Sequence, residues 1–405
     1  MNNGIILTVN IGSASKKYAL YIDGKRVLDA HLEHEEKWSS PRRSELQLRE
    51  GGYLASWNIG GVSGKKTVTS EEFARAAAVI VEMARKEKLL VGKFDVIGIR
   101  VVAPGIYFTE HREIDYTYLA KLESAQELAP LHVAATLAEI KELRRLFPDT
   151  PLVGASDSAF HKTMPDVARR YALPESLVKE YELYRYGYHG LSFQSAAKKL
   201  SSLQGGIPAR AVICHLGSGS SITALANGRS IDTTMGFTPL EGLPMATRSG
   251  SIDPGAVIFL AEKLGLTPRE LEKKLNGESG LLGVSQLSSD IRELLKAEKK
   301  GNESAKLALD LFVYNVRKQI GAMAAALGGI DALVFTGTVG ERSNIMRKRI
   351  VENLKFLKIS LSPHANNHAL GGVDAVISKT TARVSVHVFV ADEAAEIERI
   401  TNELA

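Results

Sequence analysis

The chain has 405 residues, which is long enough for two domains with separate hydrophobic cores, and a formal net charge of only +5. Lys and Arg are scattered, without a basic tract that interleaves aromatic residues, so we expect small anionic ligands as partners and no nucleic acid. No apolar stretch reaches transmembrane length and no secretory leader precedes the first predicted strand, so we expect no membrane partner and a cytoplasmic location.

The first predicted element is a β-hairpin. Residues 5–20 read IILTVNIGSASKKYAL, an apolar run, a Gly/Ser turn and an alternating run that leads to the turn Asp23-Gly24. Such a turn leaves backbone N–H groups and hydroxyls uncovered, which suits it to hold phosphate oxygens.

A mixed α/β pattern follows the hairpin. Residues 33–66 are polar with weak periodicity, and within them Gly60–Thr67 fails the P-loop template because Lys66 follows Gly64-Lys65 and no hydrophobic strand is expected before it, so we interpret it as a flexible loop. A capping box of Thr69 and Glu72 opens a predicted helix to Lys88. Further expected elements are a strand over 94–102, a helix over 132–147 and a strand over 152–156.

Half-way along the chain the hairpin pattern returns. Residues 210–225 read RAVICHLGSGSSITAL and lead to the turn Asn227-Gly228, about 205 residues after the first copy. The repeat suggests two related domains that face one polyphosphate. The chain has a single cysteine, Cys214, which excludes an intrachain disulfide. The apolar neighbours of Cys214 favour a buried strand residue over a nucleophile.

The second half continues with helices and one more strand. We expect helices near 254–264, 268–275 and 302–327, a strand over 332–337 and a helix from about residue 341. Mixed β and α segments without low complexity predict α/β domains, one over 1–150 and one over 151–405. Whether the C-terminal helix returns to the first domain stays open.

Three charged residues in unusual contexts are candidates for chemistry. Arg100 lies in a β run, where it needs either a structural ion partner or a ligand. Arg248 lies in the loop 238–255, whose Gly and Pro content favours function over scaffolding. Asp157 follows a predicted strand, where ligand or metal contact and helix N-capping are both open.

The histidines divide in the same way. His189 lies between glycines, and His132 lies at a predicted helix start that favours anions; each is either a ligand contact or a satisfied structural histidine. The other histidines are not expected to bind zinc. The residues His161, His215, His364 and His368 do not show the spacing with Cys, Asp or Glu that metal ligands have.

Together, the motifs resemble those of the acetate kinases and close short-chain carboxylate kinases. In order they are VNIGSASKKY, IRVVAPG, LAPLH, SDSAFH, YRYGYHGLS, CHLGSGSS, TTMGFTPLEGLPMATRSGSIDPG, FTGTVGERS and ADEAAEIE, and they cover essentially the whole chain. The block 233–255 is the most specific. The resemblance implies duplicated ribonuclease-H-like (actin-like ATPase) domains with a nucleotide cleft between them, as in actin, hexokinase and the Hsp70 ATPase.

The same resemblance implies the nucleotide site. On the phosphate side of the first hairpin it implies Asn10, Ser13, Ser15 and Lys17, and on the second hairpin His215, Leu216, Gly217, Ser218 and Gly219. The adenine segment would be Asp290, Ile291 and Arg292, and the later nucleotide loop Gly337, Thr338, Val339 and Gly340.

The catalytic roles also follow from the resemblance. Arg100 and Arg248 would clamp the carboxylate and the transferring phosphoryl group, and His189 would stabilise the transition state together with Arg248. Asp157 would position the acid or the metal, and Mg²⁺ (or Mn²⁺ in its place) would be held by Glu393 with Asn10 nearby. The pocket for the methyl group would be Val102, Leu131, Tyr188 and Pro239.

The implied activity is reversible phosphorylation of acetate by ATP, in a homodimer. A propionate or broad short-chain carboxylate kinase and a non-enzymatic nucleotide switch of the same fold remain as alternatives. The chain departs from the family pattern at Ala103, Pro104, Tyr188, Phe193, Ser218 and Thr338. Because the two arginines and Asp157 match, we keep the kinase assignment and leave the choice of acid open.

Overall fold

The computed structural model describes residues 4–12, 15–34, 52–90 and 92–405, apart from the side chains of 34, 130–132 and 204. These residues form two compact units, one of Met1–Ala159 with Asp392–Ala405 and one of Phe160–Ala391. The chain first passes from one unit to the other between residues 159 and 160, beyond the expected boundary at 150. The reason is that β8 (Leu152–Ser156) pairs with a strand of the first unit. The C-terminal helix belongs to that unit as well.

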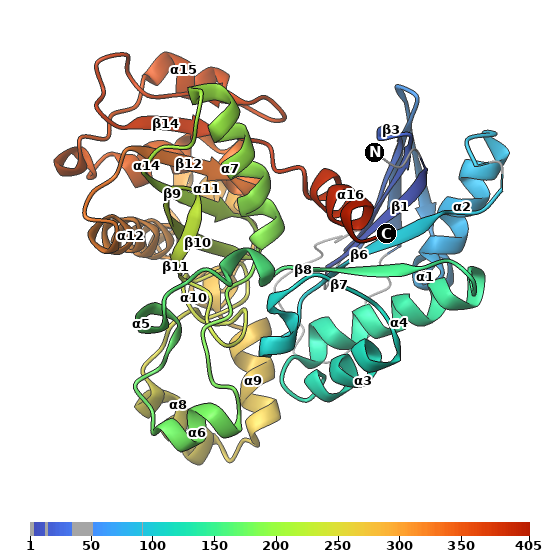
Figure 1. The fold of residues 1–405 in the computed structure, drawn as a ribbon. Coiled ribbons are helices and arrows are strands. Elements are labelled where there is room, and N and C mark those ends of the chain that lie inside the picture. The colour runs from blue at the N-terminus through green and yellow to red at the C-terminus, as the bar shows by residue number, and fades with distance from the viewer. Residues whose placement is uncertain (1–3, 13–14, 35–51, 91) are drawn as a thin grey trace. The chain divides into compact units, whose positions relative to one another are not determined.

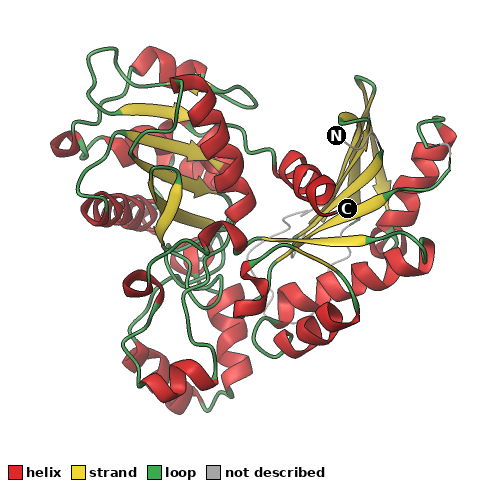
Figure 2. Cartoon of the chain, in the orientation of Figure 1, coloured by secondary structure: helices red, strands yellow, loops and turns green. Residues whose placement is uncertain are grey.

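The first unit is built on an eight-stranded sheet of order β5-β4-β3-β2-β1-β6-β8-β7 (Figures 1 and 2). Its other strands are β1 (Ile5–Ile11), β2 (Ser15–Ile22), β3 (Lys25–His34), β4 (Tyr53–Ile59), β5 (Val62–Val68), β6 (Val96–Val101) and β7 (Arg112–Glu113). β1 pairs antiparallel with β2 and parallel with β6, which pairs parallel with β8. The carboxyl ends of β1, β6 and β8 therefore meet at one edge of the sheet.

Helices cover both faces of this sheet. They are α1 (Ser70–Ala74), α2 (Ala76–Lys86), α3 (Tyr116–Ala125), α4 (Pro130–Leu146) and α16 (Glu393–Leu404). α16 packs on β1, β6 and β8, on the face of Gly98 (Figure 1). Ile97 and Ile99 point to the opposite face and join a core shared with α2, α3 and α4. The period-two alternation of β6 thus assigns its even-numbered side chains to α16.

The second unit has a six-stranded sheet of order β11-β10-β9-β12-β14-β13. The strands are β9 (Arg210–Leu216), β10 (Ser220–Ala226), β11 (Arg229–Thr233), β12 (Ala332–Thr336), β13 (Ala375–Val376) and β14 (Ser385–Val388). The helices are α5 (Asp166–Arg169), α6 (Glu175–Glu180), α7 (Gly190–Gln204), α8 (Pro254–Leu264), α9 (Pro268–Gly277), α10 (Gly280–Ser285), α11 (Ile291–Lys299), α12 (Glu303–Ala326), α13 (Gly337–Arg342), α14 (Asn344–Val351) and α15 (Pro363–His368).

Two apolar cores lie on the two faces of this second sheet. Ala211 and Ile213 pack with α7, whereas Val212 and Cys214 pack with the long helix α12. Cys214 is the buried strand residue that the sequence predicts, and burial raises the pKa of its thiol. His215 follows the parity of Ile213, so its side chain belongs to the α7 face.

The two sheets share one topology, which confirms the duplication suggested by the sequence repeat. In both, an antiparallel hairpin and a third strand lie beside two parallel strands: β3-β2-β1-β6-β8 in the first unit and β11-β10-β9-β12-β14 in the second. Each sheet therefore carries a glycine-containing hairpin turn at the edge where its parallel strands end. That the two turns face one polyphosphate stays a prediction.

Three local expectations are wrong. Gly60–Thr67 is no flexible loop: strand β4 precedes it, Gly60 and Gly61 turn the chain with positive φ, and the rest forms most of β5. The segment is still no P-loop, because a strand and not a helix follows the glycines. The helix predicted from Thr69 is interrupted at Arg75, although its capping box is confirmed. The helix expected from residue 341 begins already at Gly337.

None of the helices in the described ranges is long and apolar enough to cross a membrane.

Close packing of α16 on β6 generates a stability prediction. A Cβ at Gly98 would overlap Oγ1 of Thr401 and come within 2.8 Å of Cγ2 of Ile397, both on α16. We expect Gly98→Ala to lower the free energy of unfolding by about 1–3 kcal/mol, since overpacking forces the helix away from the sheet. Thermal unfolding would show a lower midpoint, and the double variant Gly98→Ala/Thr401→Ala would recover part of the loss.

Gly321→Ala is the matched control for this change. A Cβ at Gly321, in the middle of α12, meets nothing within 4 Å, so helix propensity should leave the midpoint equal or raise it. An unchanged midpoint in Gly98→Ala would contradict the close packing.

Candidate functional site

Four polar side chains of the first unit gather where its parallel strands end. Asn10 lies on β1, Arg100 on β6, Asp157 directly after β8, and Glu393 opens α16. Arg100 donates from Nη2 to Oδ2 of Asp157 at 2.8 Å and from Nη1 to Oδ1 of Asn10 at 3.1 Å. Asn10 in turn donates from Nδ2 to Oε2 of Glu393 at 2.6 Å. We call these four residues the arginine cluster.

Arg100 is the charged centre of this cluster. Burial alone would lower the pKa of Arg100, but the carboxylates of Asp157 and Glu393 outweigh burial and raise the pKa above its usual range. Nη1 of Arg100 lies 3.6 Å from Oε2 of Glu393. The guanidinium is thus permanently charged, and its buried Nε has no hydrogen-bond partner among the described residues. Ion pairing and ligand binding are therefore compatible at Arg100.

The arginine cluster contains oxygen atoms of the kind that Mg²⁺ takes. Glu393 and Asp157 carry carboxylates, whereas the amide oxygen of Asn10 accepts from Arg100, so the two carboxylates are the hard ligands that would hold an ion. In the part of the chain that the structure describes, no three His, Cys, Asp or Glu residues gather as a metal cage. That composition suits an ion held by one or two carboxylates, with substrate phosphates and water completing its shell.

Other predicted residues of the first unit lie near this edge or outside the described part. Lys17 is exposed and pairs with Asn10 across the first hairpin, so both side chains share a face. Ser15 opens β2, and its carbonyl accepts from N–H of Gly12 at 2.8 Å. Val102 is buried just after β6. Ser13 and the side chains of Leu131 and His132 lie outside the described residues.

In the second unit, two stacked histidines lie beside the glycine turn of the hairpin. The rings of His189 and His215 are 4.1 Å apart at 21°. Nδ1 of His189 bonds Oγ of Ser221, and Nδ1 of His215 bonds Oγ of Ser192, each at 2.8 Å. His189 has φ of 60°, a left-handed conformation that costs energy outside glycine and is often found at functional sites.

The side chain of Arg248 lies beside the same turn. A Cβ built on Gly219 would be 3.2 Å from Nε2 of His189 and 3.8 Å from Nη1 of Arg248, so that glycine brings the backbone close to both side chains. Nη1 of Arg248 also donates to the carbonyl of Pro239 at 3.2 Å. The carbonyl of the exposed Ser218 accepts from N–H of Ala246 at 3.1 Å, which ties the turn to the loop 238–255.

A polar network shapes the start of that loop. Arg185 donates from Nη2 to Oε1 of Glu241 at 2.7 Å and from Nη1 to the carbonyls of Thr233 and Thr234. The hydroxyl of Tyr171 donates to Glu241 as well. Tyr188 donates its hydroxyl to the carbonyl of Phe237 at 2.7 Å, so the hydroxyl by which it departs from the family pattern fixes this loop.

Sequence reasoning missed several of these supporting residues. Arg185, Glu241 and Tyr171 carry no motif of their own. Ser221 could have been found, because it pairs with His215 in the hairpin and must share its face. Phe193 is buried edge-to-face against His161 and His215.

The segment predicted as the later nucleotide loop, Gly337–Gly340, forms the start of helix α13 and is adjacent to the turn. A Cβ on Gly337 would lie 2.8 Å from the carbonyl oxygen of Leu216, and one on Gly217 would lie 3.8 Å from N of Thr338. N–H of Gly337 donates to Oε1 of Glu341 at 3.0 Å. Thr338 is exposed, Val339 half-buried and Gly340 buried.

A buried arginine, Arg347, holds the other side of this loop. It donates to the carbonyls of Gly340 at 2.7 Å and Glu341 at 2.9 Å. It also donates to the carbonyls of Asn366 on α15 and of Ala369, the C-cap of that helix. Burial lowers the pKa of Arg347 to about 10. The loop is therefore fixed by side chains that the sequence analysis did not single out.

The predicted adenine segment opens helix α11. Asp290 is its N-cap and forms an ion pair with the exposed Arg292, whereas Ile291 is buried in the α12 core. Burial alone would raise the pKa of Asp290, but hydrogen bonds from Arg292 outweigh it and lower the pKa. A nucleotide role for these three residues stays a prediction.

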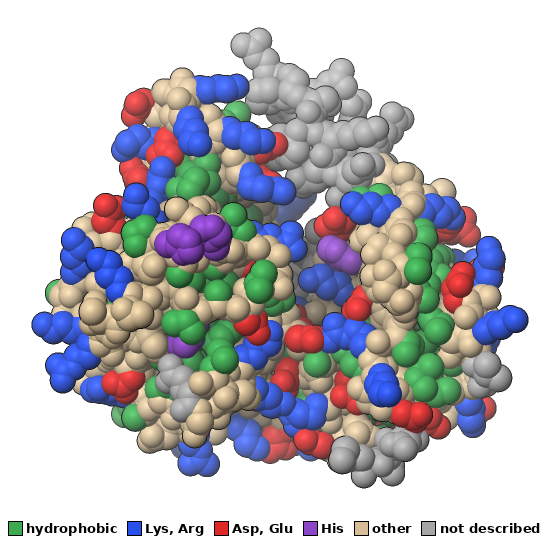
Figure 3. Space-filling model, turned by 90° about the horizontal axis from the view of Figure 1, so that it is seen from above, with side chains coloured by type: hydrophobic (Ala, Val, Ile, Leu, Met, Phe, Trp, Pro, Cys, Tyr) green, Lys and Arg blue, Asp and Glu red, His purple; other side chains and the backbone are tan. Residues whose placement is uncertain are grey.

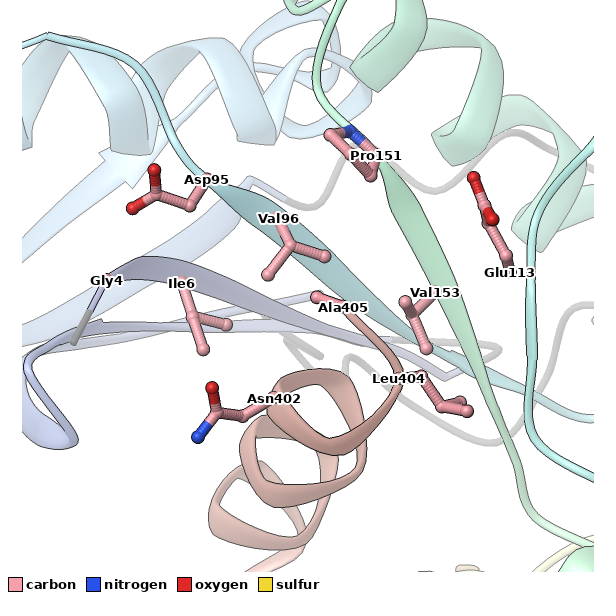
Figure 4. A pocket seen from close by; sticks show the side chains of 10 residues that line it. All are labelled: Gly4, Ile6, Asp95, Val96, Glu113, Pro151, Val153, Asn402, Leu404 and Ala405. Atoms are coloured by element: carbon pink, nitrogen blue, oxygen red, sulfur yellow. The ribbon is translucent and has the colours of Figure 1, made fainter. Parts of the chain in front are cut away.

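A cavity of about 280 Å³ lies at the other edge of the first sheet (Figure 4). Ile6 and Val96, near the starts of β1 and β6, line it together with Asp95, Glu113 and the terminal Ala405. Asn10 and Arg100 lie farther along the same two strands, so this cavity is separate from the arginine cluster. On the face drawn in Figure 3, basic side chains are interspersed with acidic and uncharged ones.

The structure thus assembles the predicted residues as two sets. Asn10, Arg100, Asp157 and Glu393 meet in the first unit, and His189, His215, Arg248 and the glycine turn meet in the second. Val102 belongs to the first unit and Tyr188 and Pro239 to the second. One methyl pocket made by these three residues is therefore still a prediction.

Comparisons with known proteins show which family the chain is similar to. The model of the Acetokinase family matches residues 5–399. An acetate kinase of Caldanaerobacter subterraneus subsp. tengcongensis is 40% identical over 407 residues, 98% of both chains. The crystal structure of Porphyromonas gingivalis acetate kinase has a TM-score of 0.83 at 34% identity and 99% coverage of both chains. A propionate kinase from Francisella tularensis subsp. tularensis SCHU S4 has a TM-score of 0.87 at 31% identity, covering 99% of this chain and 100% of its own.

The family model matches nearly the whole chain, relatives exceed 30% identity, and the two sheets share one topology. This chain is therefore a member of the acetokinase family with duplicated actin-like domains.

Proposed function

We propose that this chain transfers the terminal phosphoryl group of ATP directly to the carboxylate of acetate and, in reverse, forms ATP from acetyl phosphate. The observation that carries the proposal is Arg248 with His189 at the glycine turn of the second hairpin. Family membership supports the proposal, because relatives at about 40% identity are named acetate kinases.

Charge is the main obstacle in this reaction. A carboxylate that attacks a phosphate brings two anions together, and phosphoryl transfer needs alignment and charge neutralisation more than covalent help. Arginine opposes the repulsion with a bidentate fork that also fixes the approach angle. No general base is required, because an ionised carboxylate has no proton to lose.

The proposed roles follow from what each residue contacts. Arg248 and His189 stabilise the phosphoryl group in transfer, beside the turn made by Gly217–Gly219. Arg100 binds the carboxylate or the phosphoryl group, and Asp157 holds Arg100 in place or positions the metal. The nucleotide is bound by His215, Leu216 and Ser218 on the turn, by Gly337–Gly340 on the adjacent loop, by Lys17, and by Asp290–Arg292.

Mg²⁺, or Mn²⁺ in its place, is the proposed cofactor. Glu393 would hold it with Asn10 nearby, and the ion would neutralise charge on the transferring phosphates. Glu393 lies in the first turn of α16 and is hydrogen-bonded by Asn10, so its carboxylate is already oriented.

Propionate is the second candidate acid. A solved neighbour at 31% identity is a propionate kinase, and the proposed pocket of Val102, Leu131, Tyr188 and Pro239 is apolar. One methylene more or less in such a pocket is worth about 1–3 kcal/mol, so acetate and propionate should both react. A nucleotide switch without enzymatic activity is disfavoured, because it has no need for an arginine such as Arg248 beside a phosphate-type turn.

The decisive assay is ATP-dependent acyl-hydroxamate formation with acetate, propionate and butyrate side by side, combined with Arg248 variants. We expect Arg248→Ala to lower kcat about 100-fold, since it removes charge stabilisation of roughly 3 kcal/mol, and Arg248→Lys to restore part of the rate. The exposed Arg269→Ala on α9 is the control. Near-normal turnover in Arg248→Ala would overturn its role, and no product with any of the three acids would overturn the function.

Metal dependence is tested at α16. Activity should require Mg²⁺ or Mn²⁺, and Glu393→Gln should raise the metal concentration for half-maximal rate about tenfold or more, because one charged ligand is lost. Glu403→Gln, at the exposed end of the same helix, should leave the metal titration unchanged. Full activity in excess EDTA would remove Glu393 from a metal site.

We also propose a cytoplasmic homodimer that uses α8. This helix has no buried residue and exposes Ile258 at 61%, Phe259 at 59% and Leu264 at 53%. Large exposed apolar side chains on a helix without a buried residue suit an interface. The single Cys214 is buried and forms no disulfide, as expected in a reducing compartment.

Light scattering after size-exclusion chromatography tests the dimer. Phe259→Glu should shift the chain to a monomer, because a charge would be buried on α8. Leu307→Glu, on α12 and 58% exposed, is the matched control and should keep the wild-type mass. A monomeric wild type, or an unchanged dimer in Phe259→Glu, would contradict the proposal.

A further inference from the structure

Two serines bond the stacked histidines in a reciprocal way. His189 and Ser192 lie at the start of α7, while His215 and Ser221 lie on the hairpin of β9 and β10. Each histidine bonds the serine of the other element: His189 to Ser221 and His215 to Ser192, both through Nδ1 at 2.8 Å. Both serines are completely buried. The two hydrogen bonds therefore connect the helix start to the hairpin and fix the planes of both rings.

Proton counting decides the direction of these bonds. Among the described residues, neither the Ser192 nor the Ser221 hydroxyl has another hydrogen-bond partner. If the imidazole donated from Nδ1, a fully buried hydroxyl proton would lack an acceptor, which is unfavourable. If the hydroxyl donates to Nδ1, both the hydroxyl proton and the Nδ1 lone pair are paired. The serines are thus the donors, and in both neutral imidazoles the proton sits on Nε2.

The glycine turn lies where these Nε2 atoms are. A Cβ on Gly219 would be 3.2 Å from Nε2 of His189, and one on Gly217 would be 3.7 Å from Nε2 of His215. Two neutral N–H donors beside this turn suit phosphate oxygens. Two stacked imidazolium cations at 4.1 Å would repel each other, which disfavours a state in which both rings are charged.

We propose that Ser192 and Ser221 are positioning residues that hold His215 and His189 as neutral Nε2–H donors for phosphate oxygens at the Gly217–Gly219 turn. The proposal rests on the proposed kinase function for its ligand. Ser221 acts through His189, and hence on the phosphoryl group in transfer. Ser192 acts through His215, and hence on nucleotide binding.

The chain contains a third pair of the same kind, which serves as an internal reference. Nδ1 of His161 bonds Oγ of Ser230 at 2.8 Å, and its Nε2 bonds the carbonyl of Tyr188 at 3.1 Å. Because a carbonyl oxygen only accepts, Nε2 of His161 carries a proton. Ser230 is buried and bonds no group of the glycine turn in the described structure, so Ser230→Ala is the matched control.

Nitrogen NMR on the whole chain tests the protonation state directly. With ¹⁵N-labelled histidine at pH 7.5, His189 and His215 should each show a protonated Nε2 and an unprotonated Nδ1, as separate signals assigned by their loss in His189→Gln and His215→Gln. A protonated Nδ1 in either ring would overturn the proposal. This measurement requires no enzymatic activity, so it decides the tautomers even if the chain phosphorylates no carboxylic acid.

Kinetics then separates positioning from a merely structural role. Ser221→Ala should lower kcat about tenfold with KM for ATP within about twofold, and Ser192→Ala should raise KM for ATP about tenfold with kcat within about threefold. Ser230→Ala should lower the thermal midpoint while leaving both constants unchanged. If all three variants had the same kcat and KM for ATP, the serines would not act through the histidines.

Discussion

The arginine cluster is the constraint on which the first unit depends. The Arg100 guanidinium lies at the end of a buried strand, where an unpaired charge would be prohibitive. Asp157 after β8 and Glu393 on α16 neutralise it, and Asn10 bridges to β1. One ion-pair network therefore holds together the ends of three strands and the helix that returns from the far end of the chain. The same network fixes the Arg100 guanidinium at the edge where we propose that a carboxylate or phosphoryl group binds.

The second unit solves a similar problem with backbone and neutral donors. Its glycine turn permits close approach, and the side chains of Arg248, His189 and His215 lie beside the turn. The surrounding loops are fixed by polar side chains that do not touch the turn, such as Arg347 with its carbonyl acceptors and Glu241 with Arg185. Such rigid support suits a reaction whose catalysis is mostly alignment and charge neutralisation.

Much of this arrangement could be predicted from local patterns. Hairpins, glycine turns and period-two alternation identified β1, β2, β9 and β10 and assigned Cys214 to a buried strand. The segment Gly60–Thr67 was predicted wrongly, because a strand of polar residues at the sheet edge has no apolar pattern to reveal it. The interruption of the helix at Arg75 was missed for a related reason. The helical spacing of apolar residues continues across Arg75, whereas the helical backbone conformation does not.

The sequence by itself determined the family, the duplicated α/β architecture and the identity of the charged candidates, because motifs and repeats are properties of the chain order. Only the tertiary structure decided which of them meet. Glu393 lies 383 residues from Asn10 yet bonds it, and Ser192 bonds His215 across the gap between helix and hairpin. Such pairings depend on the registers of strands and on where α16 and α7 dock. Those are set by packing over the whole core, which no local pattern contains.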